Sequence, residues 1–223
     1  MDWSAPIDLY CERTDASFWA EPANALTNAA FLVAAAGTFL AWRRDGGRDW
    51  PELALIIVVV AVGLGSFAFH TVAARGTMLA DVIPIAIFIY GYLLLALRRF
   101  LHLSARVSIA IVIGYAAGAQ AMSWLAPAGA LNGSIGYLPA LVALIAVARA
   151  AHGRPRRGLE LAVMIFTVSV ALRTIDLAAC ETFRLGTHFL WHLLNAVVLY
   201  VLLRTAIREA GPENAACNSC RVG

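Results

Sequence analysis

Three histidines, an aspartate and a serine stand in apolar stretches of this chain at spacings that could build a metal site. Ser66 and His70 are four residues apart in one stretch, and His188 and His192 are four apart in another. Residues four apart share one face of a helix and lie about 6 Å apart along its axis. Asp81 lies in a third stretch, where an ionised carboxylate needs a cation or hydrogen-bond donors. Held at one depth of a helical bundle, the five side chains would surround a single ion.

The chemistry of such a site would be metal-assisted hydrolysis. Three neutral imidazoles with one position left open form the ligand set of a catalytic zinc ion, which activates water and polarises a carbonyl group. Asp81 could hold the water and take its proton, and the hydroxyl of Ser66 could donate to the oxyanion. We predict that His70, His188 and His192 bind zinc. Taken alone, Ser66 would more often be a hydroxyl that packs helices together.

The composition places the chain in a membrane. Hydrophobic residues make up 61% of the 223, charged residues only 14%, and the mean hydropathy is +0.75, which is more apolar than a water-soluble domain of this size. Apolar runs of about 20 residues predict spanning helices. Seven such runs cover 22–42, 52–73, 77–97, 106–125, 132–150, 158–176 and 187–206. We predict an all-α bundle of seven transmembrane helices that forms one domain over residues 1–210, followed by a tail at 211–223.

The arginines predict how the bundle is inserted. All seventeen basic residues are arginine, and they gather in the connections that follow the first, third, fifth and last spans. Because positive residues favour the cytoplasmic side, we expect the C-terminus in the cytoplasm and residues 1–21 outside the cell or in a lumen. His70, Asp81, His188 and His192 then all fall at the external end of the bundle.

Other polar residues gather near the external ends of the spans. The segment before the first span is acidic, with Asp2, Asp8, Glu12, Asp15 and Glu21. It is either a solvated segment or a site for a hard cation, because Ca²⁺ takes six to eight oxygen ligands. Glu21, Asn24 and Asn28 fall on one face of the first span, where buried amides could instead bridge helices. Arg173 and Asp176 could form an ion pair at the end of the sixth span.

Four cysteines remain. Cys11 and Cys180 both fall on the predicted external side, so in an oxidising compartment they could form a disulfide; two free thiols are the alternative. Cys217 and Cys220 lie in the tail. A lone C-x-x-C is weak evidence for metal or redox chemistry, and we assign these two cysteines no function.

As a set, these residues resemble the alkaline ceramidase family, which belongs to a larger group of seven-span membrane hydrolases. The pattern is S-x-x-x-H at Ser66 and His70, an aspartate eleven residues on, and H-x-x-x-H in the last span. Further matches are Cys11-Glu12, Glu21-x-x-Asn24-x-x-x-Asn28, Gly65-Ser66, Asp81-x-x-Pro84, Arg173-x-x-Asp176, Cys180-Glu181 and Trp191-His192. The resemblance covers the N-terminal segment and spans 1, 2, 3, 6 and 7, while spans 4 and 5 match only in hydropathy.

The resemblance implies a reaction and its residues. The three histidines would hold zinc, and Asp81 and Ser66 would assist hydrolysis of the ceramide amide to a sphingoid base and a fatty acid. A disulfide between Cys11 and Cys180 is implied as well. The arginine-only, alanine-rich chain suggests a prokaryotic source, for which another N-acyl lipid is a possible substrate.

The resemblance also implies a calcium site beside the zinc, formed by the N-terminal segment. Glu12 and Glu21 stand where the family has calcium-binding carboxylates, and Asp8 is one residue away from a third, which is Leu9 here. Two further positions of the family pattern, a tryptophan and an asparagine, are Tyr10 and Thr14.

We therefore predict a multi-pass membrane hydrolase that acts on a ceramide-like N-acyl lipid, with no nucleic-acid or protein partner. It would lie in the inner or plasma membrane of a prokaryote, or in an ER- or Golgi-type membrane of a eukaryote. One alternative is a seven-span lipid receptor that contains zinc, whose metal site should lie at the cytoplasmic end. The other is a transporter or haem protein that uses the same histidines for protons or iron.

Overall fold

The structure, a computed structural model, describes residues 2–127 and 129–210 of the chain. These residues form helices and no β-strand, and seven helical segments are long and apolar enough to cross a membrane. The all-α, multi-pass membrane fold predicted from the sequence is therefore confirmed. The direction of insertion stays a prediction, and the tail with Cys217 and Cys220 lies outside the described residues.

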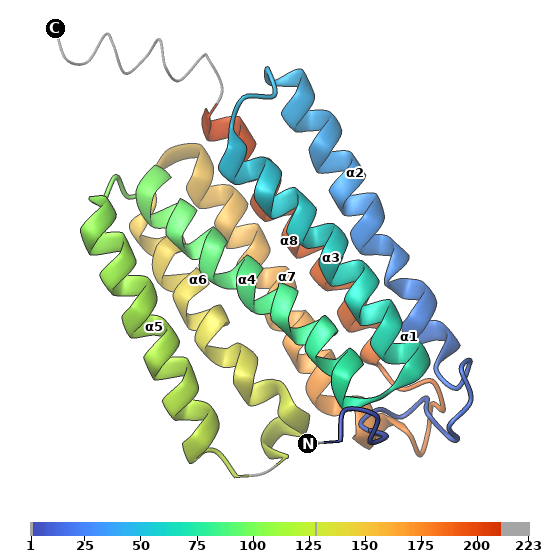
Figure 1. The fold of residues 1–223 in the computed structure, drawn as a ribbon. Coiled ribbons are helices and arrows are strands. Elements are labelled where there is room, and N and C mark those ends of the chain that lie inside the picture. The colour runs from blue at the N-terminus through green and yellow to red at the C-terminus, as the bar shows by residue number, and fades with distance from the viewer. Residues whose placement is uncertain (1, 128, 211–223) are drawn as a thin grey trace, which may run out of the picture.

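The helices follow one another with short connections (Figure 1). In chain order they are α1 (Pro22–Thr27), α2 (Ala29–Arg44), α3 (Trp50–Val72), α4 (Arg75–Arg99), α5 (Ala105–Leu125), the 3₁₀ helix η1 (Ala130–Tyr137), α6 (Leu138–Ala150), α7 (Gly153–Ala179) and α8 (His188–Ala210). Helices α1 and α2 share the first span, and η1 and α6 share the fifth. Helix α7 starts five residues before the predicted span, because the arginines there are good helix formers.

Local sequence explains where α3 begins and how it is joined to α4. The side chain of Asp49 accepts a hydrogen bond of 3.1 Å from the amide of Glu52 and so caps the start of α3, as aspartate commonly does. Helix α3 ends at Ala73, which has a left-handed backbone (φ 45°), and α4 begins at Arg75. This tight turn brings the last turn of α3, with His70, close to the first turns of α4, with Asp81.

Helix α8 lies at the centre of the bundle and α5 at its edge (Figure 1). Leu203 and Ala206 of α8 are fully buried, as is Leu159 of α7. In α5 only Ser108 is buried, and Ile113 and Leu125 are 64% and 85% exposed. Such apolar side chains are suited to contact with lipid.

A network of ions ties three helices together at one end of the bundle. Arg99 of α4 hydrogen-bonds to Glu52, to Asp49 at 2.5 Å, and to the carbonyl oxygen of Ala206 in α8 at 3.1 Å. Glu52 is only 1% exposed. This network lies at the end opposite to the N-terminal segment (Figure 1).

The N-terminal segment, residues 2–21, lies across the other end (Figure 1). It pairs with the turn between α3 and α4, where the amide of Ile7 donates to the carbonyl of Ala73 at 2.8 Å and the amide of Arg75 donates to Ala5 at 3.2 Å. A disulfide joins Cys11 to Cys180 at the end of α7. The segment is thus fixed to both halves of the bundle.

Candidate metal centre

Three histidines converge at the end of the bundle that the N-terminal segment covers. His70 comes from the last turn of α3, and His188 and His192 come from the first two turns of α8. One ring nitrogen of each lies within 4.8 Å of those of the other two, and all three residues are buried. The structure therefore brings together the three residues that the sequence predicted as zinc ligands.

Two partners orient the imidazoles of His70 and His192. The Nδ1 atom of His70 is 2.6 Å from a carboxylate oxygen of Glu21, and Nδ1 of His192 is 3.0 Å from the hydroxyl of Thr27. These contacts leave the Nε2 atom of each ring for another partner, and Nε2 of His70 is buried without one among the described residues. A ligating histidine whose second nitrogen is held by a carboxylate is the usual arrangement at metal sites, so the residues fit an ion.

Glu21, which the resemblance implied as a calcium ligand, contacts the proposed zinc ligand His70 directly. It also accepts hydrogen bonds from Asn24 and Arg13. Burial raises the pKa of Glu21, but the hydrogen bonds with His70, Asn24 and Arg13 outweigh it and hold the pKa below its usual value. Glu21 is therefore an ionised acceptor. Thr27 was not predicted as a site residue. It lies three residues after Asn24, on the same helix face, and this spacing could have indicated it.

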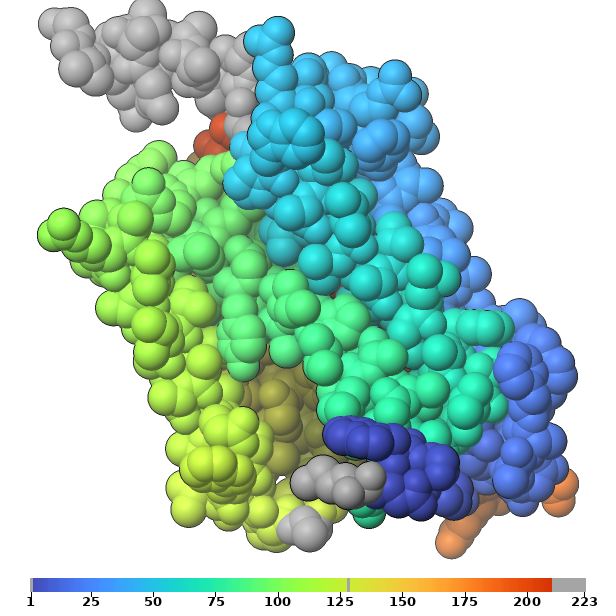
Figure 2. All heavy atoms as spheres, in the orientation of Figure 1, coloured from blue at the N-terminus to red at the C-terminus, as the bar shows by residue number. Residues whose placement is uncertain are grey.

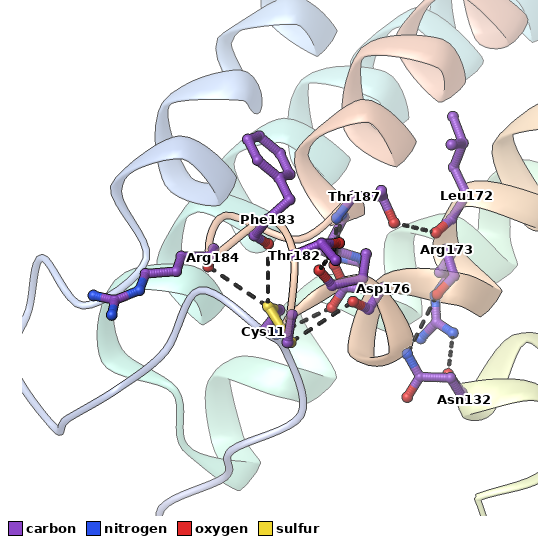
Figure 3. The surroundings of a disulfide bond; sticks show 12 residues. Cys11, Asn132, Leu172, Arg173, Asp176, Thr182, Phe183, Arg184 and Thr187 are labelled. Carbon is purple, nitrogen blue, oxygen red and sulfur yellow. Dashed lines mark hydrogen bonds between the residues drawn. A yellow bond between two sulfur atoms is a disulfide. The ribbon is translucent and has the colours of Figure 1, made fainter.

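Asp176 fixes the start of α8. One of its carboxylate oxygens accepts hydrogen bonds from the amides of Thr187 and His188, at 2.7 and 2.9 Å, and the other accepts from the amide of Cys11 at 3.1 Å (Figure 3). The amides at the start of a helix lack partners within it. A Cβ at Gly186 would lie 2.2 Å from this carboxylate, so the contact needs a glycine there.

The ion pair predicted between Arg173 and Asp176 is not among those of the described residues. Arg173 instead donates to the carbonyl of Asn132 at 2.6 Å (Figure 3) and to the hydroxyl of Ser134 at 3.2 Å. Its guanidinium also lies over the ring of Tyr137, 5.2 Å from the centroid. Asp176 is already occupied by the backbone amides of α8, and this explains the difference.

Ser66, Asp81 and Arg173 line one small cavity with His188 and His192. One carboxylate oxygen of Asp81 and Nε of Arg173 are buried in the described structure without a hydrogen-bond partner. Buried polar groups are rarely left in this state. Unpaired buried donors and acceptors beside these imidazoles fit a site that binds a polar group.

Tyr10 closes the cavity from the N-terminal segment. Its ring stacks on that of His188 with 3.7 Å between the centroids. Burial raises the pKa of its hydroxyl above the ordinary value. The disulfide at the neighbouring Cys11 fixes this contact.

An apolar pocket continues from this cavity into the bundle. Five residues line both, namely Phe31, Val62, Ile85, Tyr137 and Trp191. The pocket reaches Leu202 of α8, about 16 Å along the helix from Trp191, where the hydroxyl of Tyr92 donates to the carbonyl of Leu202 at 2.9 Å. Figure 2 shows the surface hollowed between α4, α5 and α6, and residues of α4 and α6 line this pocket.

The residues predicted to bind calcium have other partners or are exposed. Asp8 is exposed, and both oxygens of Glu12 accept hydrogen bonds from the amides of Ala23 and Asn24, at 2.7 and 2.8 Å. The amide of Asn28 donates to the carbonyl of Asn24 at 2.8 Å. In the described part of the chain, the three histidines are the one group of at least three His, Cys, Asp or Glu side chains that lie close enough together to hold a metal ion.

A family model described as "Ceramidase" matches residues 4–210 of the chain. No curated protein matches the chain.

Proposed function

Because the chain belongs to the ceramidase family, whose members hydrolyse amides of membrane lipids, we propose that it is a zinc-dependent amidase for a ceramide-like N-acyl lipid. The observation that carries the proposal is the cluster of three buried imidazoles beside Asp81, in a polar cavity that adjoins an apolar pocket. Zinc bound by His70, His188 and His192 would polarise the amide carbonyl and make a water acidic.

The residues around the histidines have distinct roles in this proposal. Asp81 holds the attacking water through its unpaired carboxylate oxygen and takes a proton as the water adds to the carbonyl carbon. It then gives that proton to the amide nitrogen as the C–N bond breaks. The hydroxyl of Ser66 donates a hydrogen bond to the carbonyl oxygen, which becomes negative in the transition state.

The shape and polarity of the cavities support a lipid substrate. One apolar chain would lie in the pocket between α3, α4, α6 and α8, and the hollow of the surface would admit it from the membrane (Figure 2). Arg173 lines the polar cavity that adjoins the apolar pocket. Its free Nε would bind an oxygen of the head group, since a buried donor gains most from a partner.

Fatty-acid release tests this function. Purified protein loaded with zinc would be given N-acyl lipids that differ in head group, including ceramide, with the released acid measured by mass spectrometry. We expect acid and free amine in equal amounts from at least one ceramide-like lipid. No release from any lipid of the panel by a protein that contains zinc would exclude the amidase.

A further inference from the structure

We infer that Arg13 supplies the positive charge that orients His70, and that this chain needs no calcium beside its zinc site. The inference rests on the proposed zinc site for the role of His70. The guanidinium of Arg13 contacts Glu21, a carboxylate that the resemblance to the ceramidase family implied as a calcium ligand.

Arg13 makes three contacts in a buried position. Its Nε donates to a carboxylate oxygen of Glu21 at 2.5 Å, its Nη2 to the carbonyl of His70 at 3.1 Å, and its Nη1 to the carbonyl of Asp15 at 3.2 Å. The Arg13 side chain is 5% exposed. A carboxylate and two backbone carbonyls are the kind of ligand that Ca²⁺ takes, and here they surround a guanidinium.

The rest of a calcium site is missing. The two oxygens of Glu12 are occupied by the amides that begin α1, Asp8 is exposed, and the residue between Asp8 and Tyr10 is a leucine. A divalent cation would have to enter beside the buried charge of Arg13, and like charges repel strongly away from water. These residues do not fit a calcium ion.

Arg13 fixes both the backbone and, through Glu21, the ring of His70. It binds the backbone carbonyl of His70 directly, and through Glu21 it fixes the carboxylate that holds Nδ1 of the ring at 2.6 Å. The planar fork of arginine suits such a double contact, which lysine cannot reproduce. Partners of this kind usually change metal affinity by about 10–100-fold. Arg13 is therefore a positioning residue, and its removal should weaken zinc binding.

The test uses the full chain loaded with zinc. Radioactive calcium binding and the thermal unfolding temperature would be measured while calcium is added to wild-type protein. We expect no bound calcium and no rise in unfolding temperature at millimolar calcium. Saturable binding near one ion per chain, or a higher unfolding temperature, would overturn the inference.

Variants test the role of Arg13 itself. Zinc retained against a competing chelator should fall about 10–100-fold in Arg13→Gln and recover only in part in Arg13→Lys. Arg156→Gln, which breaks an exposed pair with Glu160 on α7, should retain zinc as wild type does. Arg99→Gln, at the other end of the bundle, should lower the unfolding temperature without zinc loss.

The role of Arg13 can be judged without measuring hydrolysis. Wild-type zinc retention in Arg13→Gln would overturn the role of Arg13, whatever the protein hydrolyses. A wild-type protein that binds zinc without cleaving any N-acyl lipid would count against the proposed function alone. Should Arg13→Gln fail to fold, zinc retention in Arg13→Lys and the calcium titration of wild-type protein still test the inference.

Discussion

The backbones of α3 and α4 touch at Gly65 and Ala80. A Cβ placed on Gly65 would lie 2.0 Å from the carbonyl oxygen of Ala80, a distance that no side chain could occupy. The next residue of each helix is Ser66 or Asp81, the two side chains proposed to act on the substrate. The missing side chain of Gly65 therefore sets the separation of Ser66 and Asp81.

Gly65→Ala should push α3 and α4 apart. Extra atoms in a packed interior cost about 1–3 kcal/mol, so the unfolding temperature should fall, and amide hydrolysis should fall at least about tenfold because small displacements are costly in catalysis. Gly118→Ala in α5 is the matched control, since no atom lies within 4 Å of a Cβ there. Equal activity in the two variants would show that this helix contact does not position the site.

Ser66→Ala should slow hydrolysis and leave the metal in place. Removing one donor to an oxyanion typically costs about 10²–10³ in kcat. Ser66 is not a ligand in the proposed site, so zinc content should equal that of wild type. A kcat within about twofold of wild type would reduce Ser66 to a packing residue.

The apolar pocket should set the length of the chain that is accepted. Ala143 of α6 lines it, and Ala146 on the same helix is exposed. Ala143→Phe should fill part of the pocket and lower hydrolysis of long-chain lipids more than that of short-chain ones, whereas Ala146→Phe should change neither. Competition between two acyl lengths in one assay would measure the ratio, and an unchanged ratio in Ala143→Phe would place the chain elsewhere.

Reducing the disulfide should loosen the N-terminal segment. The bond between Cys11 and Cys180 closes a loop of 169 residues, and loss of a native disulfide typically costs about 2–5 kcal/mol. We expect a lower unfolding temperature after reduction, and the same loss in Cys180→Ser without reductant. A variant with serine at both Cys217 and Cys220 should respond to reductant as wild type does; if it did not respond, the effect would belong to the tail.

The histidine cluster could be predicted from the sequence because its formation depends on helix periodicity and on the alternation of the spans. A spacing of four places His188 and His192 on one face of α8, and the alternation of spans places His70 and Asp81 at the same end. Hydropathy likewise predicted the seven spans. None of these inferences needed a contact between distant residues.

The partners of the site residues could not be predicted, because they depend on how distant segments pack. Arg173 and Asp176 have the spacing of an ion pair, yet Asp176 binds the amides of Thr187 and His188. Glu21 has the position of a calcium ligand in the family pattern, yet it binds Arg13 and a histidine. Spacing gives the set of residues that can meet, and the packed structure determines which of them do.

The most direct measurement is the zinc content per chain of purified wild-type protein, His192→Ala and Asp81→Asn, determined by mass spectrometry together with hydrolysis. We predict about one zinc in wild type and in Asp81→Asn, almost none in His192→Ala, and hydrolysis in wild type only. Zinc retained in full by His192→Ala, or hydrolysis retained by Asp81→Asn, would contradict the proposed site.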